Sequence, residues 1–327
     1  MFQPVVQPLC HHVLLRRFAL LFLVVLLGGA ANPAAAEVKP STAAPRNQPQ
    51  AAQHKFLRFI ADRPDGERLD TAVVRYQRGK QRVDLIAAVH VGDRAYYHAL
   101  QVQFQRYDKL LFELIKPEDM AAGELTGSSR PQHGRVESDS ALSSLQRLIK
   151  EWLQLEFQLD DIDYRPRNFV HADLTSTKVG QALRAHAGDL VQSLMLYSIT
   201  DAARLRHSDG TLRLGSMELA LAMASSDRPR ALKRVLGREL AEVDFSGSEF
   251  GGMGFGSVLI GDRNAAAIQV LQRELASSHK RLAIFYGAAH LPDLHHRLIA
   301  LGFTRQSEAW LTAWRIGGLA VPVYKIP

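Results

Sequence analysis

The sequence predicts an α/β fold with a central mixed sheet, helices on both faces of that sheet and a helical insertion. Two segments support this class, because each reads as a buried apolar strand followed by small residues and a histidine. Residues 82–92 contain His90, and residues 281–303 contain His290 followed by an amphipathic helix. Open α/β sheets gather side chains at the carboxyl ends of their strands. The two related strand–turn–histidine units are therefore expected to bring both imidazoles to one rim.

The first 36 residues have the features of a secretory signal peptide, in the expected order. Arg16 and Arg17 precede an apolar run over 18–27, and small residues ending at Ala36 supply a cleavage site. The run is shorter than the about 20 residues that a membrane span needs. Cleavage near Ala36 and a periplasmic or secreted location are expected, with membrane contact only through a leader that stays uncleaved. Residues 37–54, rich in Ala, Pro, Gln and Ser, are expected to form a flexible linker.

Cysteine and charge content exclude several classes of protein. The single cysteine, Cys10, lies in the leader, so the exported chain would have no disulfide, no thiolate nucleophile and no cysteine-ligated metal. Without the two leader arginines, 38 basic and 33 acidic residues remain, a net charge of +5. The basic residues are scattered along the chain, which argues against nucleic-acid binding. Oligomeric state has no signal in the sequence.

One α/β domain is expected over residues 55–327. Strands over 56–60 and 71–77 are expected to form a hairpin that turns at Pro64, Asp65 and Gly66. After the first histidine unit, the pattern predicts a helix over 93–106 and an apolar strand over 109–115. Glu113 lies in the middle of that strand, where an isolated charge is costly and usually has a partner.

The helical insertion is expected at about 138–240. Its predicted elements are a helix over 140–158, a strand within 164–174 that ends at Asp173, and mainly helical segments over 179–205 and 215–236. Residues 247–256 are rich in glycine but lack the spacing of a phosphate-binding loop, so a wide turn or lid is expected. A helix over 265–276 follows. His295 and His296, on the last predicted helix, are expected at the surface.

His90, Glu113 and His290 form the leading candidate site. Imidazole and carboxylate groups are the usual ligands of Zn²⁺ or Mn²⁺ when thiolates are absent, and Co²⁺ accepts the same donors. A metal ion with three protein ligands keeps a position for water, which suits metal-assisted hydrolysis. Glu113 serves in this hypothesis either as a ligand or as the general base. The alternative is that these side chains are buried and satisfied by backbone hydrogen bonds.

Four further residues are secondary candidates. Asp173 suits a fourth ligand, an acceptor that orients an imidazole, or a helix N-cap. Arg263 suits an oxyanion stabiliser, a clamp for a substrate carboxylate, or a structural partner of Glu113. Asn264 follows it as a candidate helix cap, and His171 shares a strand face with Asp173.

The motifs, taken in order, resemble those of the TraB/PrgY/GumN superfamily, which includes TIKI-type proteins and is distantly related to ChaN-like and erythromycin-esterase-like proteins. The matching segments are Ala87-Ala88-Val89-His90, Leu111-Phe112-Glu113, Ala172-Asp173, Arg263-Asn264 and Gly287-Ala288-Ala289-His290-Leu291-Pro292. The resemblance implies both histidines at one cleft, and peptide hydrolysis as in the metal-dependent TIKI-type members. Ala87 replaces the family's glycine. Since glycine serves positive φ or close backbone approach, the departure predicts an altered first turn.

The sequence as a whole predicts an exported, metal-dependent hydrolase, peptidase-like, acting on a peptide or small-molecule substrate with Mn, Zn or Co as cofactor. Two alternatives stay open. One is a non-catalytic periplasmic protein that binds haem or a metal ion in the same cleft, and the other is a regulatory protein of the same fold. A hydrolase needs an open coordination position, whereas a haem carrier needs a broad apolar slot.

Overall fold

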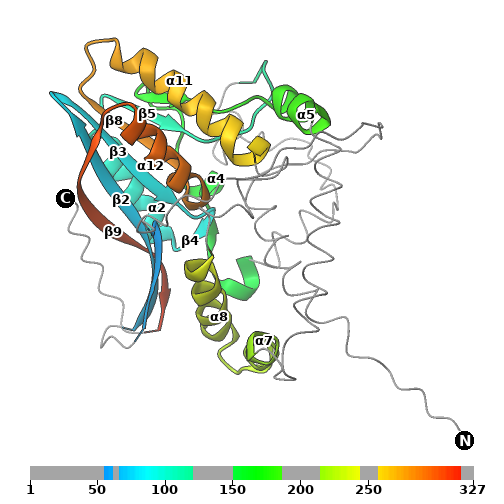
Figure 1. Cartoon of the computed structure of the whole chain (residues 1–327). Coiled ribbons are helices and arrows are strands. Elements are labelled where there is room, and N and C mark those ends of the chain that lie inside the picture. Colours follow the sequence, from blue (N-terminus) through cyan, green and yellow to red (C-terminus); the bar gives the residue numbers. More distant parts are fainter. Residues whose placement is uncertain (1–54, 62–65, 121–149, 186–213, 244–256, 318–327) are drawn as a thin grey trace, which may run out of the picture.

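The computed structural model describes residues 55–61, 66–120, 150–185, 214–243 and 257–317 (Figure 1). The expected signal peptide and linker lie outside these residues. So do the glycine-rich segment 247–256 and parts of the helices expected over 140–158 and 179–205. Within the described ranges, no helix is long and apolar enough to cross a membrane.

A seven-stranded mixed sheet forms the centre of the molecule, which confirms the predicted α/β class. Its strand order is β1-β2-β3-β8-β5-β7, with β9 also paired to β2. The strands are β1 (Leu57–Ile60), β2 (Glu67–Arg78), β3 (Gln81–Ala88), β5 (Lys109–Phe112), β7 (Phe169–His171), β8 (Arg281–Gly287) and β9 (Thr304–Ile316). Strands β3, β8, β5 and β7 run parallel, and β1 and β9 pair antiparallel to β2. A separate two-stranded sheet joins β4 (Val91–Gly92) to β6 (Glu156–Phe157).

Helices cover both faces of the sheet (Figure 1). The helices and helical turns of the described residues are α2 (Arg94–Phe104), α4 (Gln158–Asp161), α5 (Ser176–Ala185), α7 (Leu214–Ala224), α8 (Arg228–Glu242), the π-helical turn η3 (Ser257–Asp262), α11 (Arg263–Leu275), the 3-10 turn η4 (Ala288–His290) and α12 (Leu291–Ala300). Phe104 of α2 packs on Phe285 of β8, whereas His295 of α12 contacts Tyr76 of β2. Strand register places Tyr76 and Leu282 on one face. Phe285 lies on the other face, because successive side chains alternate.

The neighbouring strands β3 and β8 form a topological switch point. The chain leaves β3 through α2 onto one face and leaves β8 through α12 onto the opposite face. Adjacent strands with such divergent connections leave a crevice beyond their carboxyl ends. Ala88 pairs with Gly287 at the ends of these two parallel strands, so both histidine units reach the same edge as predicted.

The helix predicted over 140–158 ends earlier than its apolar spacing suggests. Helical conformation stops at residue 153, and Gln154 takes a left-handed φ of 50°. The next residues form β6, and Gln158 begins α4. Leu155 keeps the helical spacing of apolar residues, yet it is buried from an extended segment. The apolar spacing therefore predicted the burial of Leu155 correctly but predicted the wrong backbone conformation for it.

The remaining differences concern the expected insertion and the end of the chain. Strand β7 pairs with β5, so this part of segment 138–240 belongs to the main sheet. The helix predicted over 215–236 is divided into α7 and α8, because Asp227 caps a new helix by accepting a hydrogen bond from the Arg230 N–H. Strand β9 had no counterpart in the prediction. The expectation that His295 lies at the surface was wrong, since its ring is buried and bonds the Tyr76 hydroxyl at 2.7 Å.

Candidate functional site

The candidate residues gather at the carboxyl edge of the parallel strands. Glu113 directly follows β5, so it lies just beyond the strand and not in its middle as predicted. His90 follows β3 and Asp173 follows β7, each by two residues. His290 closes the 3-10 turn η4 after β8. Four strand ends thus supply four of the candidate side chains to one edge, as the rule for open sheets requires.

Arg263, the first residue of α11, links the two carboxylates. Its side chain is almost wholly buried and donates to both oxygens of Asp173, at 2.9 and 2.6 Å. It also donates to Glu113 Oε1 at 2.6 Å, so the predicted alternative of a Glu113 partner is present. Burial alone would lower the pKa of Arg263, but the charges of Glu113 and Asp173 raise it above its ordinary value. The guanidinium therefore stays charged at every physiological pH.

Glu113 is held as an anion. Its second oxygen, Oε2, accepts the Gly287 backbone N–H at 2.6 Å. Burial raises the pKa of Glu113, whereas Arg263 and the two imidazoles lower it more, and the resulting pKa lies well below the usual range. Glu113 and Asp173 thus place two carboxylates against the one guanidinium of Arg263. A buried excess of negative charge favours a bound cation or a proton.

Each imidazole is oriented by a side-chain amide. His290 Nδ1 lies 2.8 Å from Asn264 Oδ1, while the amide nitrogen of Asn264 donates to the His290 carbonyl oxygen and to Asp293. His90 Nδ1 lies 3.1 Å from Gln158 Oε1. Since both amide oxygens are acceptors, each histidine donates from Nδ1. His290 Nε2 lies 3.4 Å from Glu113 Oε1 and 3.5 Å from Arg263 Nη1.

Gly287 lies at the point where these groups converge. A Cβ atom added to it would be 3.2 Å from Glu113 Oε2, 3.3 Å from His90 Nε2 and 3.8 Å from His290 Cδ2. Its φ of −51° is ordinary, so space and not backbone conformation requires glycine here. The two imidazoles and the carboxylate therefore surround one small volume beside the backbone.

Ala87 does not alter the first turn by strain. It is fully buried within β3 and pairs with Tyr286, and Gln154 is the one non-glycine residue with positive φ among those the structure describes. The register places Ala88, not Ala87, opposite Gly287. The two histidine turns still differ, because His90 lies on a bend before β4 and His290 in a 3-10 turn.

The cluster contains the types of donor group that bind divalent metal ions. Two imidazole Nε2 lone pairs and a carboxylate are a common ligand set, and the amide-bound Nδ1 atoms are the outer contacts that such ligands need. Arg263 competes for this position, because it already binds Glu113 and lies 3.5 Å from His290 Nε2. Within the described ranges, no group of three His, Cys, Asp or Glu side chains is arranged to hold an ion.

The secondary candidates have roles that differ from several of those predicted. Both Asp173 oxygens bind Arg263, so this carboxylate neither orients an imidazole nor faces the cluster as a further ligand. Asn264 orients His290 instead of capping α11. His171 Nε2 lies 2.6 Å from the Leu114 carbonyl oxygen, and burial lowers the pKa of His171. Gln158 was not among the predicted site residues. It is buried, and a buried polar side chain needs a hydrogen-bond partner, which here is the His90 ring.

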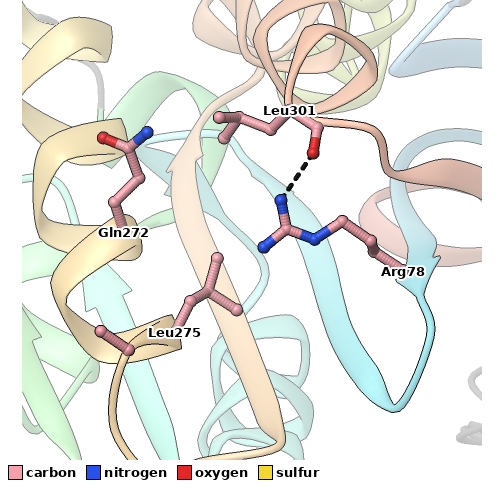
Figure 2. Close-up of a pocket in the computed structure, with 5 residues that line it drawn as sticks. Arg78, Gln272, Leu275 and Leu301 are labelled. Atoms are coloured by element: carbon pink, nitrogen blue, oxygen red, sulfur yellow. Dashed lines mark hydrogen bonds between the residues drawn. The ribbon is translucent and has the colours of Figure 1, made fainter.

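A small cavity of about 240 Å³ lies away from this cluster (Figure 2). It is lined by Arg78, Gln272, Leu275, Ala276 and Leu301, and Arg78 donates to the Leu301 carbonyl oxygen at 2.6 Å. Gln272 and Leu275 lie at the end of α11, whereas Arg263 begins it. At a rise of about 1.5 Å per residue, the helix separates the two places by roughly 18 Å.

No family model, curated protein or solved structure matches this chain. The resemblance to the TraB/PrgY/GumN superfamily accordingly rests on the motifs in the sequence.

Proposed function

We propose that this chain is an exported hydrolase of the TraB/PrgY/GumN type that cleaves a peptide or a small carbonyl substrate with the help of Mn, Zn or Co. One observation carries the proposal. The Nε2 side of two fixed imidazoles and the Glu113 carboxylate surround the same small volume beside Gly287. His90 is held through Nδ1 and its Nε2 faces this volume, and a ligand or a proton acceptor needs such a nitrogen.

The residues that would hold the metal ion are His290 through Nε2 and Glu113. His90 would be either a third ligand or the proton acceptor, because the one lone pair on its Nε2 serves only one of these roles. A bound divalent ion supplies Lewis acidity to a carbonyl oxygen and lowers the pKa of water. The excess of carboxylates over guanidinium groups in the cluster supports a cation at this place. The same excess suits the alternative of a non-catalytic metal-binding protein, so turnover has to be measured separately.

His90 is the better candidate for proton transfer. Burial lowers the pKa of His90, while Glu113 acts in the opposite sense, and the ring is neutral near pH 7. His90 is partly exposed, whereas His290 is fully buried. In the role of proton acceptor, with Nε2 not bound to the ion, His90 Nε2 accepts a proton from water as the oxygen attacks the carbonyl carbon. The bond to the leaving group then breaks, and His90 returns that proton to the leaving nitrogen or oxygen.

Glu113 and Arg263 serve as electrostatic groups in this proposal. A carboxylate with a pKa well below its usual range is a weak proton acceptor, which makes Glu113 less suitable as the general base. As an anion it stabilises an imidazolium that forms beside it. Arg263 remains charged 3.5 Å from His290 Nε2 and stabilises negative charge that develops on the substrate.

Metal content of the purified chain tests the proposal. After loading with Mn²⁺, Zn²⁺ or Co²⁺, we expect about one ion per chain and loss of that ion in His290→Ala. Loss of the ion in His90→Ala as well would identify His90 as a ligand, and retention would identify it as the proton acceptor. His98→Ala is the control, because His98 is exposed on α2. Loaded protein is then screened against a peptide library. Failure to take up any of the three metals refutes the proposal, and uptake without hydrolysis supports the non-catalytic binding protein.

Export through a cleaved leader is a separate part of the proposal. Sequencing the amino terminus of the protein from the periplasmic fraction should give a chain that starts at Glu37. Recovery of the intact amino terminus from the membrane fraction would instead support a leader that anchors the protein.

A further inference from the structure

We infer that Gln158 is a positioning residue that fixes His90 in the tautomer with the proton on Nδ1 and directs His90 Nε2 into the cluster. The inference rests on the proposed function, in which His90 Nε2 is a metal ligand or a proton acceptor. It adds a residue that lies outside every motif on which the family resemblance depends.

Gln158 contacts His90 twice. Its backbone N–H donates to the His90 carbonyl oxygen at 2.9 Å, and its side-chain Oε1 lies 3.1 Å from His90 Nδ1. Gln158 is only 4% exposed, so water does not readily replace the second contact. The main chain and the ring of His90 are thus held by one residue, and the ring has little freedom to rotate away.

A second contact holds the other end of the Gln158 amide. The amide nitrogen Nε2 donates to the Tyr164 hydroxyl at 2.7 Å, which leaves Oε1 for His90. Tyr164 is itself buried, packs on Phe112 and has a pKa raised by that burial, so its hydroxyl stays protonated. An amide oxygen can only accept, and therefore His90 must donate from Nδ1.

Asn264 holds His290 in the same way. Its amide nitrogen donates to the His290 carbonyl oxygen at 3.0 Å, and its Oδ1 lies 2.8 Å from His290 Nδ1. Gln158 lies 68 residues after its histidine, whereas Asn264 lies 26 residues before its own. The two amide–imidazole contacts therefore have the same geometry, although their spacing in the sequence differs. At both places an amide holds the Nδ1 side of the imidazole, so Nε2 of each ring is turned toward the cluster.

The tautomer of His90 tests the inference without metal and without substrate. Long-range ¹H–¹⁵N spectra of the histidine-labelled chain distinguish a proton on Nδ1 from one on Nε2, and His90→Gln identifies the His90 signals. Gln158→Met removes the acceptor oxygen at similar size. Gln158→Glu keeps an acceptor oxygen, and the Tyr164 hydroxyl can donate to it. Gln101→Met is the matched control, since Gln101 bonds only the Asp163 main chain in the described contacts.

We expect the Nδ1–H pattern for His90 in the native chain, in Gln158→Glu and in Gln101→Met. In Gln158→Met, the signals should move toward the other tautomer while those of His290 stay unchanged. If His90 is a ligand, metal affinity should also fall about 10- to 100-fold in Gln158→Met. An unchanged His90 pattern in folded Gln158→Met, or Nε2–H in the native chain, refutes the inference. If the tautomer behaves as expected and the native chain binds no metal, the proposed function fails and the positioning role of Gln158 stands.

Discussion

Gly287 offers the most direct test of how tightly the cluster is built. Replacing it by alanine adds one methyl group beside Glu113 Oε2 and His90 Nε2, at 3.2 and 3.3 Å. These separations are shorter than ordinary van der Waals contact, so the carboxylate and the imidazole must move apart by a few tenths of an ångström. Glu113 cannot move freely, because Arg263 and the Gly287 N–H hold its two oxygens.

Two opposing effects determine the size of the change. Extra volume in a tightly packed site typically costs about 1–3 kcal/mol. Alanine also restricts the unfolded chain, which stabilises the folded protein by about 0.4–1 kcal/mol where the backbone is compatible, as the φ of −51° is here. The free energy of unfolding of Gly287→Ala should therefore fall by roughly 1–2 kcal/mol. Metal uptake should weaken as well, because one of the two displaced groups, Glu113, is a proposed ligand.

Urea unfolding followed by fluorescence, together with metal titration, measures both effects. Gly261→Ala is the matched control, because a Cβ atom at Gly261 would have no atom within 4 Å and its φ is not positive. That control should be neutral or more stable by up to about 1 kcal/mol. A Gly287→Ala protein that is as stable as the control and binds metal as the native chain does would show that the described packing around Gly287 is wrong.

Three further predictions concern the groups around the cluster. Arg263→Met leaves two carboxylates buried without a cation and should lower the free energy of unfolding by about 3–5 kcal/mol. His90 has a pKa below the 6.5 of the unfolded chain, so its contribution to stability is present above pH 6.5 and is lost as the pH falls below it. His90→Gln should therefore reduce the loss of stability between pH 7.5 and 5.5. Trp314→Phe removes the indole donor to the Val91 carbonyl oxygen, 2.7 Å away, and should cost about 1–3 kcal/mol.

Urea unfolding measures all three changes, each with its own control. The His90→Gln series is measured at several pH values between 7.5 and 5.5. Arg281→Met should change stability by at most about 1 kcal/mol, since Arg281 is 58% exposed in its pair with Asp108. An equal effect of the two arginine variants would contradict the importance assigned to burial. For the pH prediction, His98→Gln should keep the native pH dependence. Trp310→Phe serves for the last, because Trp310 is only partly buried, and an equally large loss there would argue against the Val91 bond as the cause.

The individual predictions show where sequence patterns carry information. The strand before each histidine was predictable, because a mainly apolar run suits a strand buried on both faces. Glu113 drew attention for a sound reason, since a charge next to an apolar strand needs a partner, and Arg263 is that partner. The helix boundary at Gln154 was not predictable. A left-handed φ at a glutamine is stabilised by the surrounding packing, and no local signal announces it.

By itself, the sequence determined the α/β class, the two strand–histidine units and the small set of polar residues that follow the strands. Local spacing suffices for this, because it indicates which residues lie on the buried face of each strand or helix. Tertiary structure alone decided which groups touch. Three contacts join residues that are far apart in the chain: Arg263 pairs with Asp173, Gln158 bonds His90, and β9 pairs with β2. Such contacts depend on the register of the sheet and on the packing of helices against it. Neither can be read from the spacing of residues within one segment.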